Sequence, residues 1–154
     1  SALNKFKNVI KIFTSSNFDH ENKIIKNEIL KFTYKNNDTF FFSSLGHLNY
    51  VSLMKVSSVV IGNSSSGVLE TPSLGIPTVN IGNRQRGRII SNNVINSKYE
   101  KKNIIKNIKK ALLLDKKKLN KIGSPFYKRR TPEKIAKKII SFKCDIKKDF
   151  KDLI

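Results

Sequence analysis

The stretch that decides the fold is VVIGNSSSGVLETPSLGIPTVNIGNRQRGRII, residues 59–90. It opens with the apolar run Val59 to Ile61, which predicts a buried strand. Gly62 and Asn63 follow, and both tolerate the backbone angles of a tight turn. Three serines and a short helical stretch come next, before a second apolar run, Thr78 to Ile81, that predicts another strand. This order of strand, turn, helix and strand is typical of a parallel α/β sheet.

The serine turn between these two strands favours an anion. A strand that enters a helix through small residues leaves backbone N–H groups unpaired, and the helix dipole adds partial positive charge there. Ser64, Ser65 and Ser66 add hydroxyl donors, and Glu70 could accept hydrogen bonds from a diol such as a ribose. Arg84 and the two arginines after it could neutralise a diphosphate. Taken alone, however, the serines are equally typical of a helix cap and the arginines of a solvated loop.

Strand and helix patterns alternate along the rest of the chain. We expect an α/β fold with an open, mostly parallel Rossmann-like sheet and helices on both faces. Residues 1–144 should form one domain and residues 145–154 a charged tail; in the last helix Ile135, Ile139 and Ile140 should face inward. The predicted strands cover residues 8–13, 39–42, 59–61, 78–81 and 94–95, and the predicted helices cover residues 22–32, 48–55, 68–70, 99–114, 116–122 and 131–143.

Ligands of open parallel sheets bind beyond the carboxyl ends of the strands. Asn17, Ser43, Ser64 and Arg84 all follow predicted strands. We therefore expect these four residues to cluster at one edge of the sheet.

Composition and charge limit the classes of partner. The 154 residues suffice for one domain with a core, and no apolar run approaches the length of a membrane span. The net charge of +20 invites a nucleic-acid interpretation. However, the basic residues are nearly all lysine and are spread along the chain, and the richness in Asn, Ile and Lys is what an AT-rich genome produces. We expect no nucleic-acid partner, but a field that attracts anions such as a nucleotide diphosphate.

Cysteine and histidine are too sparse for a disulfide framework or a metal site. Cys144 is the single cysteine, and His20 and His47 are isolated, so we expect no metal and no internal disulfide. The polar, basic first residues do not resemble a signal peptide. These features are consistent with a reducing compartment, and we expect a cytoplasmic protein.

Three motifs of the chain resemble those of one enzyme family. GNSSSGVLETPSLGIPTVNIGNRQRGR (residues 62–88) closely resembles the signature of the hydrolysing UDP-N-acetylglucosamine 2-epimerases. SLGHLNYVSLMKVSSVV (44–60) looks like the segment that precedes it in those enzymes, and SSNFDHENKII (15–25) resembles their nucleotide-contacting PN-x-D-x-G region. The resemblance covers residues 9–140, nearly the whole chain.

The resemblance implies a role for individual residues. Family members have two facing domains in the glycosyltransferase-B arrangement, and this chain looks like the C-terminal one, which carries most of the UDP contacts. By position in the motif, Ser64 and Ser65 match serines that bind the diphosphate, and Glu70 matches the glutamate that holds the ribose. Arg84 and Asn17 match further nucleotide contacts.

Two loops depart from the family pattern. Residues 16–21 lack the proline and the glycine of PN-x-D-x-G, so the geometry of the Asn17 contact does not carry over directly from the family. The alternative interpretation of Asn17 is a residue that stabilises a turn. Residues 124–130 read SPFYKRR where many relatives have NPYGDG, so that loop should not be assumed equivalent.

The family reaction removes the C2 proton of the sugar, eliminates UDP to form a glycal, and hydrates the glycal to N-acetylmannosamine. The catalytic acids and bases are expected in the missing N-terminal domain, so none is assigned here and the chain alone should at most bind UDP weakly. We expect a UDP-sugar substrate (UDP-N-acetylglucosamine or a UDP-diacetamido sugar), no cofactor and no membrane partner; a homo-oligomer is a candidate assembly of the intact enzyme. The alternatives are the nucleotide-sugar-binding half of a glycosyltransferase and a basic nucleic-acid-binding module.

Overall fold

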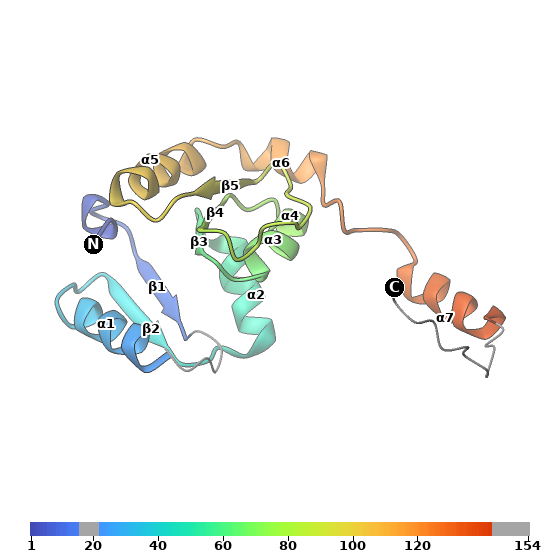
Figure 1. The fold of residues 1–154 in the computed structure, drawn as a ribbon, viewed down its shortest axis with the longest axis horizontal. Coiled ribbons are helices and arrows are strands. Elements are labelled where there is room, and N and C mark those ends of the chain that lie inside the picture. The colour runs from blue at the N-terminus through green and yellow to red at the C-terminus, as the bar shows by residue number, and fades with distance from the viewer. Residues whose placement is uncertain (16–21, 143–154) are drawn as a thin grey trace, which may run out of the picture.

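Short strands alternate with helices in the computed structural model, which describes residues 1–15 and 22–142 (Figure 1). The strands predicted at residues 39–42 and 78–81 and the helix predicted at 116–122 have these bounds in the structure. The elements in order are the 3-10 turn η1 (Leu3–Lys5), β1 (Lys11–Thr14), α1 (Asn22–Tyr34), β2 (Thr39–Phe42), α2 (Gly46–Val56), β3 (Val60–Gly62), α3 (Ser66–Leu69), α4 (Thr71–Leu74), β4 (Thr78–Ile81), β5 (Val94–Ser97), α5 (Lys101–Leu112), α6 (Lys116–Ile122) and α7 (Thr131–Ser141).

All the described strand pairs are parallel, which confirms the expected α/β, Rossmann-like class. β1 pairs with β2, and β4 lies between β3 and β5. The sequence pattern led us to expect one open sheet, whereas hydrogen bonding divides these strands into a two-stranded and a three-stranded sheet. Figure 1 shows the two groups apart, with β1 and β2 beside α1.

The core lies between the three-stranded sheet and α5. Val79 of β4 packs against Ile108 and Ala111 of α5, all three at most 2% exposed. Burial of such side chains is the main favourable term in folding. On α3, Gly67 lies so close to β4 that a Cβ added there would be 3.0 Å from the Thr78 side chain. A glycine at this point therefore lets the serine turn and its helix pack closely on the central strand.

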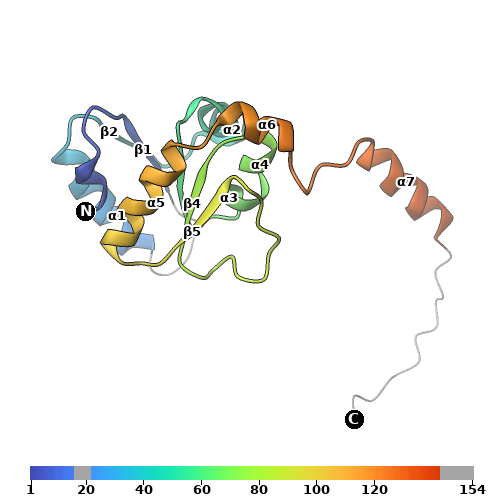
Figure 2. The same ribbon diagram turned by 90° about the horizontal axis from the view of Figure 1, so that it is seen from above.

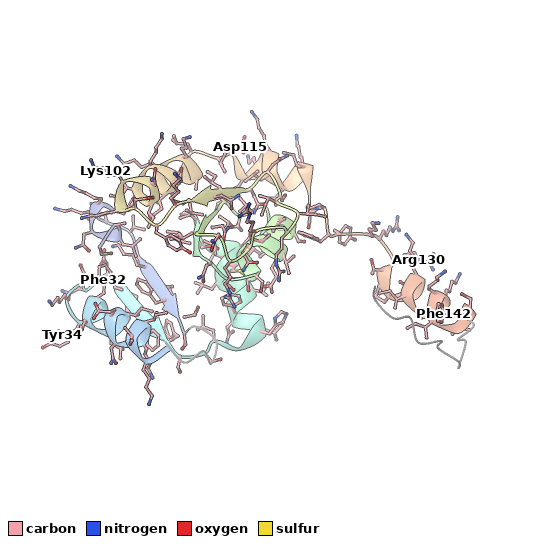
Figure 3. The ribbon with its side chains drawn as sticks, in the orientation of Figure 1. Phe32, Tyr34, Lys102, Asp115, Arg130 and Phe142 are labelled. Carbon is pink, nitrogen blue, oxygen red and sulfur yellow. The ribbon has the colours of Figure 1, made fainter. Side chains whose placement is uncertain are left out.

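The two-stranded sheet is held by an aromatic contact and an ion pair. Phe13 of β1 and Phe32 of α1 meet edge to face, with ring centroids 5.9 Å apart. Lys11 Nζ donates to Asp38 Oδ2 at 2.5 Å, and this hydrogen bond holds the pKa of Asp38 below its ordinary value. Two residues after Phe32, at the C-terminal end of α1, Tyr34 projects into solvent and is 91% exposed (Figure 3).

Helix α7 does not pack as expected. Its residues Ile135, Ile139 and Ile140 are 53%, 69% and 85% exposed, so the prediction that they face inward was wrong. Figures 1 and 2 show why: the chain leaves α6 and carries α7 away from the other elements. Neither α7 nor any other helix in the described part of the chain is long and apolar enough to cross a membrane. The predicted tail, residues 145–154, lies outside the described residues.

Candidate functional site

The serine turn joins the carboxyl end of β3 to α3 and closes partly on itself. Ser66 N donates to Ser64 Oγ at 3.4 Å, and the Ser64 and Ser66 hydroxyl oxygens are 3.3 Å apart. Gly67 N donates to Ser64 O at 3.2 Å. Ser64 is exposed, while Ser65 and Ser66 are half-buried. The turn therefore presents small hydroxyl side chains at the end of a strand, as the sequence predicted.

The helix that follows is shorter than the anion argument assumed. α3 has four residues, and its Val68 and Leu69 amides both donate to Ser65 O, at 2.9 and 2.8 Å. One helical turn carries a much smaller dipole than a full helix. The expected contribution of a helix dipole is therefore corrected downward. An anion here would be held by the turn itself and by the hydroxyls of Ser64 and Ser65.

Glu70 lies at the junction where α3 ends and α4 begins. Its amide donates to Ser66 O at 3.0 Å, which ties its backbone to the serine turn. Its Oε2 is buried and has no hydrogen-bond partner among the described residues. A buried carboxylate oxygen without a partner is costly and rare in proteins. This oxygen is therefore a natural acceptor for donors of a bound ligand.

The arginine loop, residues 82–93, is tied to the serine turn by Gln85. Gln85 is 3% exposed, and its Nε2 donates to Asn63 O at 2.7 Å. Its Oε1 is also buried without a partner in the described part of the chain. Arg84 and Arg86, on either side, are exposed. The structure thus brings Arg84 to the loop that adjoins the serine turn, as expected from the positions after neighbouring strands.

Sequence reasoning missed Gln85 as a structural tie. The one signal in the sequence is that Gln85 is an uncharged amide between two arginines, both of which are exposed in the structure. A buried amide within a charged loop indicates a side chain that turns inward to satisfy backbone groups. The burial of Gln85, however, depends on the distance between two loops, which residue pattern alone does not give.

A buried polar network fixes the elements behind the turn. Thr71 Oγ1 donates to Gly67 O at 2.8 Å and accepts from Thr78 Oγ1 at 2.7 Å and from Asn93 Nδ2 at 3.0 Å. Asn93 Nδ2 also donates to Ile76 O at 2.7 Å. Thr71, Thr78 and Asn93 are at most 2% exposed. The network joins α3, α4, β4 and the strand entry to β5, so it holds the serine turn in a fixed position.

The two remaining residues expected at this edge are Asn17 and Ser43. Asn17 lies outside the described residues. Ser43 follows β2, which belongs to the two-stranded sheet rather than to the sheet of the serine turn. No group of three or more metal-ligating side chains occurs in residues 1–15 and 22–142. Among the described residues, the candidate site therefore groups Ser64, Ser65, Glu70 and the loop of Arg84.

Parallel strands with helical crossovers and a polar turn at a strand's carboxyl end define a Rossmann-like α/β protein. Comparison with known proteins gives the family. Residues 1–140 match the family model described as UDP-N-acetylglucosamine 2-epimerase, and the chain belongs to this family.

The curated relatives are bacterial proteins, and each is much longer than this chain. A Campylobacter jejuni protein named GDP/UDP-N,N'-diacetylbacillosamine 2-epimerase (hydrolyzing) is 45% identical over 97 residues, which are 62% of this chain and 25% of that protein. The Escherichia coli polysialic acid biosynthesis protein P7 is 35% identical over 99% of this chain and 39% of its own length. A UDP-N-acetylglucosamine 2-epimerase of Neisseria meningitidis is 33% identical over 71% of this chain and 28% of its own length. The chain thus spans between a quarter and two fifths of these relatives.

Proposed function

We propose that this chain is the UDP-binding part of a hydrolysing 2-epimerase. The intact enzyme would convert UDP-N-acetylglucosamine, or a related UDP-diacetamido sugar, into N-acetylmannosamine or its analogue and UDP. Family membership and the names of the relatives support an epimerase of UDP-sugars. Residues 1–144 would belong to the C-terminal domain of a glycosyltransferase-B fold.

The residues of the site would divide the nucleotide between them. Ser64 and Ser65 would hold the diphosphate through turn amides and hydroxyls, and Arg84 would neutralise its charge. Glu70 would accept hydrogen bonds from the ribose hydroxyls. The observation that carries this proposal is the buried, unpartnered Oε2 of Glu70 directly after the serine turn, because a ribose supplies the donors that this oxygen lacks.

The chemistry would take place on the sugar, away from these residues. A base removes the C2 proton, the C1–O bond breaks and its electron pair leaves with UDP, and water adds to the resulting glycal. Each proton transfer needs a positioned acid or base. We assign these groups to parts of the intact enzyme beyond this chain. The role of the described residues is to bind and orient the UDP leaving group.

The role of Glu70 is tested by Glu70→Gln in the intact protein. We expect the Kd for UDP, measured by calorimetry, to rise at least about tenfold, because hydrogen bonds to a charged acceptor contribute about 1.5–3 kcal/mol. Glu133→Gln, which changes an exposed carboxylate on α7, is the matched control and should leave the Kd unchanged. A Glu70→Gln protein with native circular dichroism and native UDP affinity would contradict the proposal.

A further inference from the structure

Arg84 and Gln85 are the two central residues of a tight turn that follows β4. A hydrogen bond from Arg86 N to Asn83 O, at 2.9 Å, closes this turn, as in a β-turn. The two central side chains have opposite surroundings, because Arg84 is exposed whereas Gln85 is 3% exposed. The turn therefore presents a cation to solvent and buries the amide beside it.

Gly82, the residue before the turn, fixes one end of it. Its φ of 81° lies in the left-handed region that favours glycine, and its amide donates to Ser97 O of β5 at 2.8 Å. A Cβ added at Gly82 would overlap the phenol of Tyr99, so the tyrosine ring lies directly against the Gly82 backbone. Tyr99 is nevertheless 68% exposed. It therefore contacts the start of the turn at the protein surface and contributes little to the core.

Gln85 fixes the other end of the turn. Its Nε2 donates to Asn63 O at 2.7 Å, and Asn63 directly precedes the serine turn. These two anchors, at Gly82 and at Gln85, flank Arg84 in the chain. The backbone of Arg84 is therefore fixed relative to both β5 and the serine turn, while its side chain stays exposed.

Anchors of this kind matter for an arginine that binds a diphosphate. The guanidinium binds phosphate oxygens with a planar, forked set of donors, so its contribution depends on its orientation. A long side chain on a mobile loop loses more conformational freedom on binding than one on a fixed backbone, and this loss weakens the affinity. A misplacement of about 1 Å can lower a rate roughly a hundredfold. The position of the Arg84 backbone should therefore decide how strongly its guanidinium binds a ligand.

We propose that Tyr99 and Gln85 are positioning residues that direct Arg84 toward the diphosphate of UDP. The proposal rests on the proposed function, in which Arg84 neutralises this diphosphate. Neither positioning residue acts by contact with the ligand. Tyr99 acts through the backbone of Gly82, and Gln85 acts through its hydrogen bond to Asn63 O.

A double-mutant cycle on UDP binding by the intact protein, measured by calorimetry, tests the coupling of these residues to Arg84. We expect Arg84→Met to raise the Kd at least about thirtyfold, because it removes charge-assisted hydrogen bonds. Gln85→Met and Tyr99→Ala should each raise the Kd about tenfold. In either of these variants, the further change Arg84→Met should raise the Kd less than about threefold, because a misplaced guanidinium has little left to contribute. A further rise of about thirtyfold in either variant would overturn the positioning role of the residue changed there.

Matched controls separate positioning from general stability. Tyr99→Phe keeps the ring, so it should bind UDP with the unchanged Kd, and a Kd as high as that of Tyr99→Ala would contradict the ring contact. Tyr34→Ala removes another exposed tyrosine, on α1, and Asn36→Leu removes another amide tie, from Asn36 Nδ2 to Phe32 O at 2.7 Å. In these two controls Arg84→Met should keep its full effect on the Kd. A reduced effect there would show that lost stability alone explains the cycle, which would also overturn the proposal.

The same measurements distinguish failure of this proposal from failure of the proposed function. Absence of UDP binding by the unchanged intact protein, or an unchanged Kd for Arg84→Met, would overturn the proposed function of Arg84 and the positioning roles with it. An equal effect of Arg84→Met in the unchanged protein, in Gln85→Met and in Tyr99→Ala would leave the proposed function standing and overturn the positioning roles alone.

Discussion

At the scale of single residues, the hydroxyl of Thr71 has the most partners behind the serine turn. It is fully buried, donates to Gly67 O, and accepts from Thr78 and Asn93. A buried group that loses its partner costs more than a hydrogen bond contributes when formed. The position of the turn relative to β4 therefore depends on one threonine as much as on the serines that face solvent.

Replacing this hydroxyl should destabilise the chain. We expect Thr71→Val to lower the free energy of unfolding by about 2 kcal/mol, because Gly67 O loses its side-chain donor and Thr78 Oγ1 keeps only its longer bond to Ile76 O. Urea denaturation measures the change. Thr33→Val, which removes one helix back-bond from a half-buried threonine on α1, is the control and should cost less than about 1 kcal/mol. Equal losses for the two variants would show that the network has no special role.

At the scale of elements, two amphipathic helices with similar sequence patterns have different surroundings. Ile108 on α5 is 2% exposed and packs on β4, whereas Ile139 on α7 is 69% exposed. Ile108→Ala should lower the free energy of unfolding of this 154-residue chain by about 3 kcal/mol, because it opens a cavity. Ile139→Ala should change it by less than about 0.5 kcal/mol. A large loss for Ile139→Ala in urea denaturation would mean that α7 packs on the other elements in solution.

The pairing of β1 with β2 should depend on pH through Lys11 and Asp38. The hydrogen bond from Lys11 holds the pKa of Asp38 below its ordinary value of 3.8, so the folded state favours the carboxylate. The stabilisation is present above the pKa of the unfolded state and is lost as the pH falls through the lower pKa of the folded state. We expect the Tm of Asp38→Asn to lie below that of the unchanged chain by a constant amount from about pH 7 to about pH 5, with the difference shrinking below about pH 3.8. A Tm difference independent of pH would contradict this role for the ion pair.

At the scale of the whole molecule, our proposal places UDP binding in this chain and the catalytic acids and bases in parts of the intact enzyme beyond it. We expect the intact protein to release UDP and N-acetylmannosamine from UDP-N-acetylglucosamine, detected by proton NMR, and the 154-residue chain to release no UDP above the buffer rate. UDP-N-acetylmannosamine formed without free UDP would show that the intact enzyme is not of the hydrolysing type. Rapid release by the 154-residue chain would show that its own residues suffice for catalysis.

The relative positions of the candidate residues could be predicted because most of them are close in the chain. Ser64 and Ser65 lie in one turn, Glu70 follows the short helix after it, and Arg84 follows the next strand, so a local pattern places them near one another. Their role in binding stays a prediction. Gln85 was not predicted, because its burial depends on contact with Asn63, 22 residues earlier. The exposure of Ile135 on α7 was also missed, since a helical period shows which face is apolar but not whether anything covers it. The Asn17 contact, the oligomeric state and the cellular compartment stay predictions.

The amino-acid sequence by itself determined the class of fold, the order of the elements, the serine turn and the family, because all of these depend on short-range pattern and local backbone preference. Only the tertiary structure decided that the described strands form two sheets, that α7 stands apart, and that the Oε2 atom of Glu70 is buried without a hydrogen-bond partner among the described residues. These features depend on which surfaces meet across long separations in the chain. Hydrophobic burial is non-directional. An apolar side chain therefore favours burial, but its chemistry does not specify which surface covers it.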